Sequence, residues 1–274
     1  MCETHLAEHI SECGDGGINE DVFGYFQNRF WVIDGATSKT KRHYYNDTSD
    51  ARYLVNKFSA ELNKTSFLNQ RLNNKELMSV AMENVRKQVP KVDFTKEEIS
   101  FKPSFAIAIL FATKSHVFID ILSDCYVLVK NKEEIRTYTD HRIEVIKSLT
   151  KKMKDYVDRN NLSDEIAERL IKEQKINNRK LMNKNNGYWV GTTDGIAFSN
   201  TASFELERES PIEVIICTDG FYKMVKYHLI DTNELFCSTK SFKTLVEQLR
   251  IYERNHKEIG SKTSDDATAI KLIL

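Results

Sequence analysis

The sequence predicts an α+β fold with antiparallel sheets. Segments with an apolar spacing near 3.6 residues alternate with short runs rich in β-branched and aromatic residues. The β-rich runs occur in groups, whereas a parallel sheet would alternate strands strictly with helices. The chain has three prolines, no Gly/Ser-rich tract and no internal repeat, so we expect one domain over residues 1–274.

The first third of the chain is predicted to form a hairpin and two helices. Residues 22–26 and 30–33 are β-rich, and Gln27-Asn28-Arg29 between them suits a hairpin connection. Residues 50–62 and 75–89 each place apolar side chains on one helical face. We therefore expect two amphipathic helices after the hairpin.

The middle of the chain is predicted to be a β-meander followed by a polar helical segment. The β-rich runs have connectors short enough for antiparallel pairing; they are residues 105–112, 116–122, 126–130 and, as a possible fourth, 135–138. Residues 143–186 are helical in period and polar, with eleven Lys/Arg against six Asp/Glu between positions 147 and 184. Either a solvated charged face or a site for an anion or partner explains this excess.

The last third is predicted to contain short strands, a helix and a final strand. The β-rich runs are residues 188–191, 196–198, 214–217 and 267–274, and the helix covers residues 241–253. Trp31 and Trp189 lie in β-rich runs and are assigned to the core.

Charge and apolar content exclude several classes of function. Forty Lys plus Arg balance forty Asp plus Glu, so we expect neither nucleic acid nor an anionic membrane as a partner. No apolar run approaches the roughly 20 residues that span a bilayer, and the N-terminus lacks the pattern of an export signal. The expectation is a soluble, cytoplasmic protein.

Cysteine usage argues against nucleophilic thiol chemistry. The five cysteines include no C-x-x-C pair, and none lies in the H-C-x5-R setting of cysteine phosphatases. We interpret them as reduced structural thiols. No G-x4-G-K-[ST] phosphate-binding loop is present either.

Two β-rich runs end in Asp-Gly. One leads into Asp34-Gly35 and the other into Asp219-Gly220. A strand that ends in Asp places a carboxylate at the rim of a sheet, and the glycine permits close approach of another group. Asp-Gly is also a common turn pair, and the chain has two more, at Asp15-Gly16 and Asp194-Gly195.

Two further acidic sites flank strands, Asn19-Glu20-Asp21 and Ser264-Asp265-Asp266. If Asp34, Asp219 and Asp265 lie ~4 Å apart, three like-charge pairs at a dielectric constant of ~20 cost ~12 kcal/mol. That cost rivals the roughly 5–15 kcal/mol stability of a domain. Such a cluster must be protonated or hold metal, and oxygen ligands without His or Cys favour Mg²⁺ or Mn²⁺.

These motifs together resemble those of the metal-dependent protein phosphatases of type 2C. The matching residues, in order, are Asn19-Glu20-Asp21, Asp34-Gly35, Ser123-Asp124, Thr218-Asp219-Gly220 and Ser264-Asp265-Asp266-Ala267-Thr268. The resemblance covers residues 19–274, with least support in the segment 143–186. It implies a four-layer α-β-β-α sandwich of two antiparallel sheets flanked by helices.

The resemblance also implies a centre of two divalent cations, Mg²⁺ or Mn²⁺. Asp34 would bridge both, Gly35 would offer its carbonyl to one, and Asp219 and Asp265 would bind the other. Glu20 and Asp21 would bind metal directly or through water. Asp124 matches the position of a third, weaker cation, and the competing interpretation is that it forms the tip of a two-residue hairpin.

The implied activity is hydrolysis of phosphoserine and phosphothreonine in proteins, by a hydroxide that bridges the two cations. Asp34 and Asp219 are the candidate catalytic residues. Two alternatives remain: a phosphatase-like regulatory or interaction module with weak or no catalysis, and a hydrolase of small phosphate esters. The sequence does not identify the substrate-binding residues or the oligomeric state.

The sequence departs from the family pattern at three places. Asp34-Gly35 is followed by Ala36-Thr37-Ser38, without the His-Gly-Gly that supplies a general acid. Gly16 stands where members often have a phosphate-binding Arg, and Pro103-Ser104-Phe105 replaces a Gly-Ser/Thr-Thr element. Nearby basic substitutes are Lys39, Lys41, Arg42 and His43.

Overall fold

The structure, a computed structural model, describes residues 4–36, 43–45, 48–92, 94, 101–208, 211–256 and 262–274. The described strands form two five-stranded antiparallel sheets. Sheet A has the order β1 (His5–Glu12), β10 (Ala267–Ile273), β9 (Glu213–Cys217), β6 (Tyr126–Asn131) and β7 (Glu134–Tyr138). Sheet B has the order β2 (Asp21–Phe26), β3 (Arg29–Ala36), β4 (Ser104–Ala112), β5 (His116–Leu122) and β8 (Ala202–Glu207).

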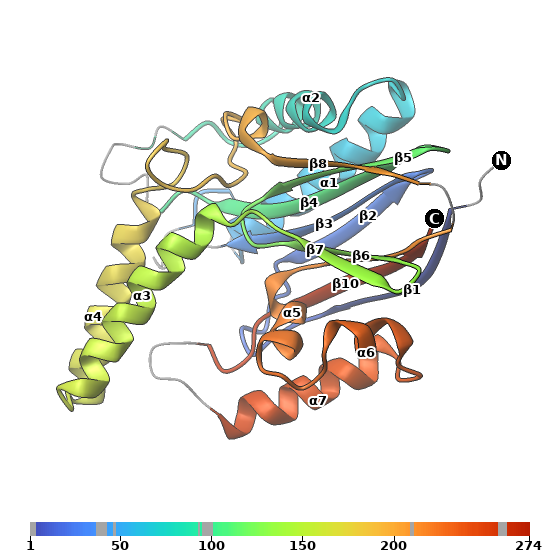
Figure 1. Cartoon of the computed structure of the whole chain (residues 1–274). Coiled ribbons are helices and arrows are strands. Elements are labelled where there is room, and N and C mark those ends of the chain that lie inside the picture. The colour runs from blue at the N-terminus through green and yellow to red at the C-terminus, as the bar shows by residue number, and fades with distance from the viewer. Residues whose placement is uncertain are drawn as a thin grey trace.

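Helices cover the outer faces of both sheets (Figure 1). The helices are α1 (Asp50–Leu68), α2 (Asn74–Arg86), α3 (Arg142–Arg159), α4 (Asp164–Arg179), α5 (Asp219–Lys226), α6 (Thr232–Cys237) and α7 (Phe242–Asn255). Helices α1 and α2 lie on sheet B, and α5, α6 and α7 lie on sheet A. The result is the predicted four-layer α-β-β-α sandwich.

Three apolar clusters correspond to the three interfaces between the four layers. The cluster between the sheets includes Val32 and Ala108 of sheet B and Val127, Ile216 and Ile270 of sheet A. A second cluster joins sheet B to α1 and α2, and a third joins sheet A to α5, α6 and α7. The inner strands β4 and β9 are buried on two faces, which explains why β4 reads as a nearly continuous apolar run, whereas exposed residues recur along the edge strands β1, β7 and β8.

Local capping signals explain where several helices begin. The Ser49 hydroxyl accepts a hydrogen bond from the Arg52 amide at the start of α1. Asn73 and Glu76 form a capping box at the start of α2, and each bonds the backbone amide of the other. These caps satisfy amides that have no partner within the helix.

The predicted meander is wrong in its connectivity, although its four strands exist. β4 pairs with β5 in sheet B, and β6 pairs with β7 in sheet A, but β5 and β6 belong to different sheets. The short connector at residues 123–125 therefore carries the chain from one sheet to the other. Asp124 is consequently not the tip of a hairpin.

The sequence prediction also missed or misassigned shorter elements. Residues 196–198 are not a strand, and Phe198–Asn200 form a 3₁₀ turn. Residues 188–191 make only isolated bridges, at Tyr188 and Gly191. The prediction missed β1, β8, α5 and α6; in β1, Glu8 and Glu12 occupy half-buried positions, which hides the usual apolar alternation.

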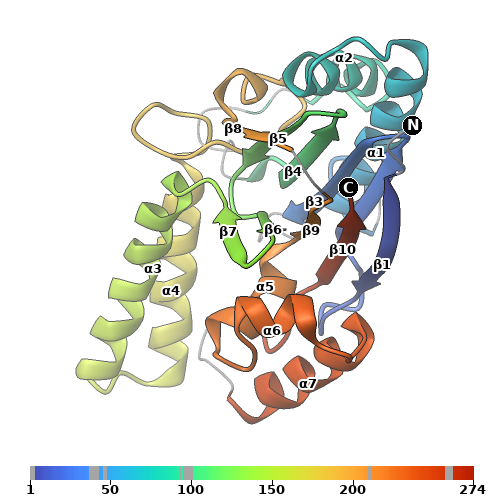
Figure 2. The ribbon, with the colours of Figure 1, turned by 45° about the vertical axis from the view of Figure 1, so that its right-hand side comes forward.

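Helices α3 and α4 form an antiparallel pair that projects from the side of the sandwich (Figure 2). Only a few apolar residues anchor the pair: Ile143 and Ile146 pack with Met182, Tyr188 and Val190. The polar segment predicted at residues 143–186 is therefore a helical hairpin outside the four layers.

Two further predictions can be compared with the described residues. The four cysteines in the described part of the chain are free thiols, as expected. Within the same residues, no helix combines the length and the apolar character that crossing a bilayer requires.

Candidate metal centre

Asp21 and Asp34 face each other across the first two strands of sheet B. Asp21 is the first residue of β2 and pairs in register with Asp34 near the end of β3. Asp21 is buried, and its Oδ2 accepts a 2.8 Å hydrogen bond from the Thr218 hydroxyl at the end of β9. This bond connects sheet B to the end of β9 in sheet A, near Glu20, Asp34, Asp124, Asp219 and Asp265, which we call the acidic rim.

Both Asp-Gly pairs at the strand ends have a steric reason for their glycine. A Cβ on Gly35 would lie 2.6 Å from the Glu20 carbonyl oxygen, and a Cβ on Gly220 would lie 1.9 Å from the Asp266 carbonyl oxygen. Neither position tolerates a side chain without backbone movement. The glycines therefore allow two acidic loops to approach the ends of β3 and β9.

Asp266 holds the same two loops together through its carboxylate. Its Oδ1 accepts a hydrogen bond from the Gly14 amide at 2.8 Å, and its Oδ2 accepts one from the Glu20 amide at 2.7 Å. The carboxylate is buried, so these bonds replace hydration. Asp266 thus positions neighbouring Asp265 and Glu20 at the rim.

Most of the predicted site residues line one cavity of about 870 Å³ at this rim. Its walls include Glu20, Asp34, Gly35, Asp124, Asp219 and Asp265. Asp21 lies behind the wall, bonded to Thr218. The structure therefore brings together residues that are up to 245 positions apart in the chain, from Glu20 to Asp265.

Lysines neutralise three of these carboxylates. Lys147 Nζ lies 2.7 Å from Asp124 Oδ2 and 3.1 Å from Asp219 Oδ2. Asp265 has Lys223 Nζ at 3.2 Å and Lys262 Nζ at 3.3 Å. Sequence analysis missed all three lysines, because nothing in their local patterns distinguishes them from solvated surface lysines.

Asp34 differs from these three carboxylates. Among the described residues, no lysine or arginine forms an ion pair with it. Burial is the main reason that the pKa of Asp34 is raised well above its usual value, and the neighbouring Asp21, Asp219, Asp124 and Asp265 raise it further. The pKa of Asp21 is raised for the same main reason.

This environment fits a hard divalent cation. The donors at the rim are carboxylate and carbonyl oxygens, which Mg²⁺ and Mn²⁺ prefer. The anionic form of Asp34 is disfavoured and lacks a cationic partner among the described residues, so this carboxyl group is either protonated or stabilised by a bound cation. Within these same residues, however, no three His, Cys, Asp or Glu side chains already have the arrangement of a metal site.

The cavity also has a basic wall that sequence analysis did not assign to the site. Lys172, Lys175 and Arg179 on α4 line it, together with Glu168 of the same helix. Their spacing of three and four residues places them on one helical face, and this periodicity was available in the sequence. The Arg179 guanidinium donates to the Lys102 carbonyl at 2.7 Å and to the Ser104 hydroxyl at 3.3 Å.

A further cation stands near the position of the missing family arginine. Lys262 Nζ lies 3.9 Å from the place of a Cβ on Gly16, and both residues line the cavity. Among the substitutes that the sequence suggested, Lys39, Lys41 and Arg42 lie outside the described residues. His43 is exposed, and it is not among the described residues that line the cavity.

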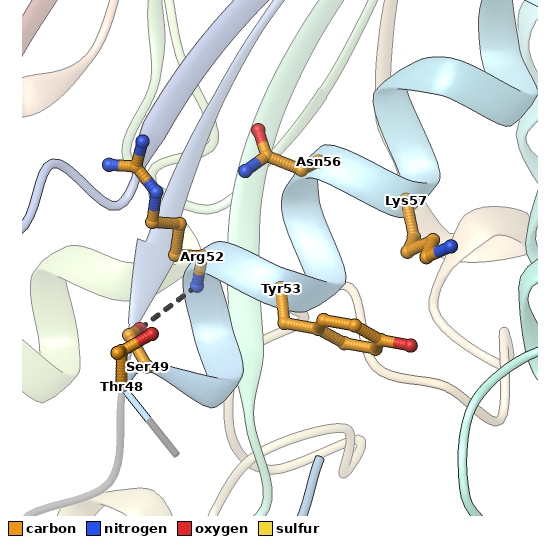
Figure 3. Close-up of a pocket in the computed structure, with 6 residues that line it drawn as sticks. All are labelled: Thr48, Ser49, Arg52, Tyr53, Asn56 and Lys57. Carbon is orange, nitrogen blue, oxygen red and sulfur yellow. Dashed lines mark hydrogen bonds between the residues drawn. The ribbon is translucent and has the colours of Figure 1, made fainter. Parts of the chain in front are cut away.

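A second, smaller hollow of about 360 Å³ lies along the first turns of α1 (Figure 3). Thr48 and Ser49 line both this hollow and the larger cavity, so the two are adjacent. The Ser49 hydroxyl donates to Glu20 Oε1 at 2.5 Å, and Arg52 donates to the Asn19 carbonyl at 2.6 Å. The start of α1 therefore fixes the Asn19-Glu20 loop.

Comparison with known proteins gives a clear result for the fold. No protein-family model and no curated protein matches the sequence. Among solved structures, the Mycobacterium tuberculosis serine/threonine phosphatase PstP/Ppp is similar, with a TM-score of 0.58, 10% identity, and coverage of 99% of this chain and 98% of that chain. The Staphylococcus aureus serine/threonine phosphatase Stp1 has a TM-score of 0.56, 15% identity, and coverage of 100% and 95%.

The chain has the fold of the type 2C serine/threonine phosphatases. The resemblance indicated by the sequence motifs is thus confirmed at the level of the fold. A third similar structure is the catalytic domain of PstP in complex with two manganese ions, with a TM-score of 0.53, 11% identity, and coverage of 98% and 97%. In this type 2C fold, the acidic rim lies where the two sheets meet at one end of the sandwich.

Proposed function

We propose that this protein is a Mg²⁺- or Mn²⁺-dependent phosphatase that hydrolyses phosphoserine and phosphothreonine in proteins. The observation that carries the proposal is the convergence of Asp34, Asp219 and Asp265 on one cavity in a phosphatase fold. The manganese ions in a similar structure support the choice of metal.

Different residues at the acidic rim would bind metal ions and position the metal ligands. Asp34, Gly35, Asp219 and Asp265 would hold two divalent cations, with Glu20 and Asp21 binding directly or through water. When bound, such cations lower the pKa of a water molecule and offset charge on the phosphoryl oxygens. Thr218 and Asp266 keep the acidic residues in place through hydrogen bonds.

The basic wall would orient the substrate. Lys262 near Gly16 supplies positive charge for the phosphoryl group, and the α4 residues Lys172, Lys175 and Arg179 extend that charge across the cavity. A basic wall attracts a phosphate dianion electrostatically. The hollow along α1 is adjacent to the cavity, and it could accommodate residues beside the phosphorylated one.

One observation favours a different function. Asp124, Asp219 and Asp265 already have lysine partners, and no three acidic side chains in the described parts of the chain have metal-site geometry. A phosphatase-like interaction module with weak or no catalysis would be stable in this state without metal. The third candidate, a hydrolase of small phosphate esters, uses the same acidic rim.

Turnover of two substrates separates these functions. We expect the protein with Mn²⁺ to hydrolyse para-nitrophenyl phosphate and, with higher kcat/KM, a phosphothreonine peptide; a chelator should abolish both activities. Asp34→Asn, Asp219→Asn and Asp265→Asn should lose activity while remaining folded. Asp194→Asn is the matched control, because Asp194 belongs to an Asp-Gly pair whose carboxylate binds Lys102 and Thr192.

Each outcome has a distinct meaning. Activity no higher than that of Asp34→Asn would favour the interaction module. Hydrolysis of the small ester without hydrolysis of any phosphopeptide would favour the small-ester hydrolase. Equal losses in Asp194→Asn and Asp219→Asn would show that the centre is misassigned.

A further inference from the structure

Lys147 reaches from the projecting helical pair into the acidic rim. Its Nζ lies 2.7 Å from Asp124 Oδ2 and 3.1 Å from Asp219 Oδ2, so one ammonium group bridges two carboxylates. Asp124 and Asp219 lie on different parts of the fold, after β5 and after β9. The ammonium group therefore holds these two parts together.

The start of α3 fixes Lys147 in this position. The buried Asp140 carboxylate accepts hydrogen bonds from the Ser123 amide at 3.3 Å and from the Arg142 amide at 3.1 Å. The first bond ties α3 to the turn that carries Asp124. Ile143 and Ile146 of α3 are buried in one apolar cluster, and Ile146 directly precedes Lys147.

Most carboxylate oxygens of Asp124 and Asp219 already have a partner, so few are left for another ligand between these two residues. Asp124 Oδ1 accepts the Ser123 hydroxyl at 2.9 Å, and its Oδ2 contacts Lys147. Asp219 uses Oδ2 for Lys147, which leaves Oδ1 for the rim. The side chains of Asp124 and Asp219 are 19% and 18% exposed, so solvent screens the bridge only in part.

We propose that Lys147 replaces a third divalent cation: its ammonium group bridges Asp124 and Asp219, so the centre binds two metal ions and not three. This inference rests on the proposed metal centre. A third cation between these carboxylates would meet the ammonium group at contact distance, and like charges repel strongly in a partly buried site. Asp124 is then a partner of Lys147 and not a metal ligand.

The number of bound Mn²⁺ ions tests this inference without any measurement of activity. Native mass spectrometry and equilibrium dialysis of the full chain should give two ions for the wild type and two for Asp124→Asn. Lys147→Met should bind a third ion, and Lys147→Met/Asp124→Asn should return to two. Lys151→Met is the matched control, since Lys151 is an exposed lysine one turn further along α3; it should bind two.

The outcomes separate the inference from the proposed function. Three ions in the wild type, with the third lost in Asp124→Asn, would overturn the inference and leave the proposed function intact. No ions in the wild type would overturn both. A folded Lys147→Met that still binds two ions would overturn the inference; Lys147→Gln, which keeps a polar group, gives a second measurement if the methionine variant unfolds.

Discussion

The Thr218 hydroxyl donates a 2.8 Å hydrogen bond to Asp21 Oδ2, across the interface between the two sheets. Thr218 is fully buried, and its hydroxyl oxygen also accepts the Thr268 amide at 3.1 Å. One hydroxyl group therefore fixes the position of an acidic side chain at the rim relative to β9 and β10. It links the stability of the sandwich to the geometry of the centre.

Replacing this hydroxyl should cost stability. Thr218→Val keeps the shape of the side chain but leaves the Asp21 carboxylate and the Thr268 amide without their partner. We expect a loss of about 1–3 kcal/mol in the free energy of unfolding, measured with urea in the presence of chelator. Thr218→Ser keeps the hydroxyl and should lose less; a smaller loss for valine than for serine would contradict this account.

Removing the charge of Asp34 should have opposite effects with and without metal. In chelator, Asp34→Asn should raise the melting temperature, because burial and neighbouring carboxylates disfavour the Asp34 anion. With Mn²⁺ at a hundred times its Kd, the wild type should gain about 2.7 kcal/mol, and the variant should gain much less. A lower melting temperature of the variant in chelator would contradict the prediction.

The metal-free protein should become less stable as the pH rises above the usual carboxyl range. The pKa values of Asp21 and Asp34 are raised in the folded state, mainly by burial. Between the unfolded value of about 3.9 and the folded values, the folded state binds more protons than the unfolded state. The free energy of unfolding therefore decreases with pH in this window.

Urea unfolding in chelator across a pH series measures this slope. Other groups also titrate, so the decisive quantity is the difference between the wild type and Asp34→Asn. The variant should show a shallower decrease in the free energy of unfolding with pH. Parallel curves for the two proteins would contradict the assignment to Asp34.

Lys262 should contribute to substrate binding. Lys262→Gln removes the ammonium group beside Gly16, and a hydrogen bond to a charged group is worth about 1.5–3 kcal/mol, or roughly tenfold or more in KM. The measurement is KM for a phosphothreonine peptide at saturating Mn²⁺, with the Kd for Mn²⁺ determined separately because Lys262 also contacts Asp265. Lys243→Gln, at an exposed lysine on α7, is the control; equal KM values in both variants would exclude this role.

Local patterns predicted most of the elements because periodicity is a property of neighbouring residues. The hairpin of β2 and β3 and the helices α2 and α7 lie close to their predicted bounds, and α1 begins at the predicted residue but continues six residues further, to Leu68. The connectivity of the strands was harder to predict. A three-residue connector such as residues 123–125 has the same sequence character whether it joins two paired strands or carries the chain from one sheet to the other. The pairing of β6 with β9 in sheet A shows that this connector crosses between the sheets.

The acidic rim was predictable to a greater extent than its surroundings. Asp34 and Asp219 stand out in the sequence because each follows an apolar β-rich run and precedes a glycine, and the structure explains those glycines by close backbone contacts. Lys147 has no such local mark. It is one of eleven basic residues between positions 147 and 184, and nothing in the sequence distinguishes it from the rest, of which Lys172, Lys175 and Arg179 line the cavity.

The sequence by itself determined most of the helices and strands, the oxygen donors, and the positions of the acidic residues at or beside the ends of strands. Tertiary structure alone decided that these donors share one cavity and that a lysine 72 residues from Asp219 bonds to it. The physical reason is range: backbone periodicity and capping act over a few residues, whereas charge pairing acts through space. Which charges meet is set by how the two sheets and the projecting helices pack.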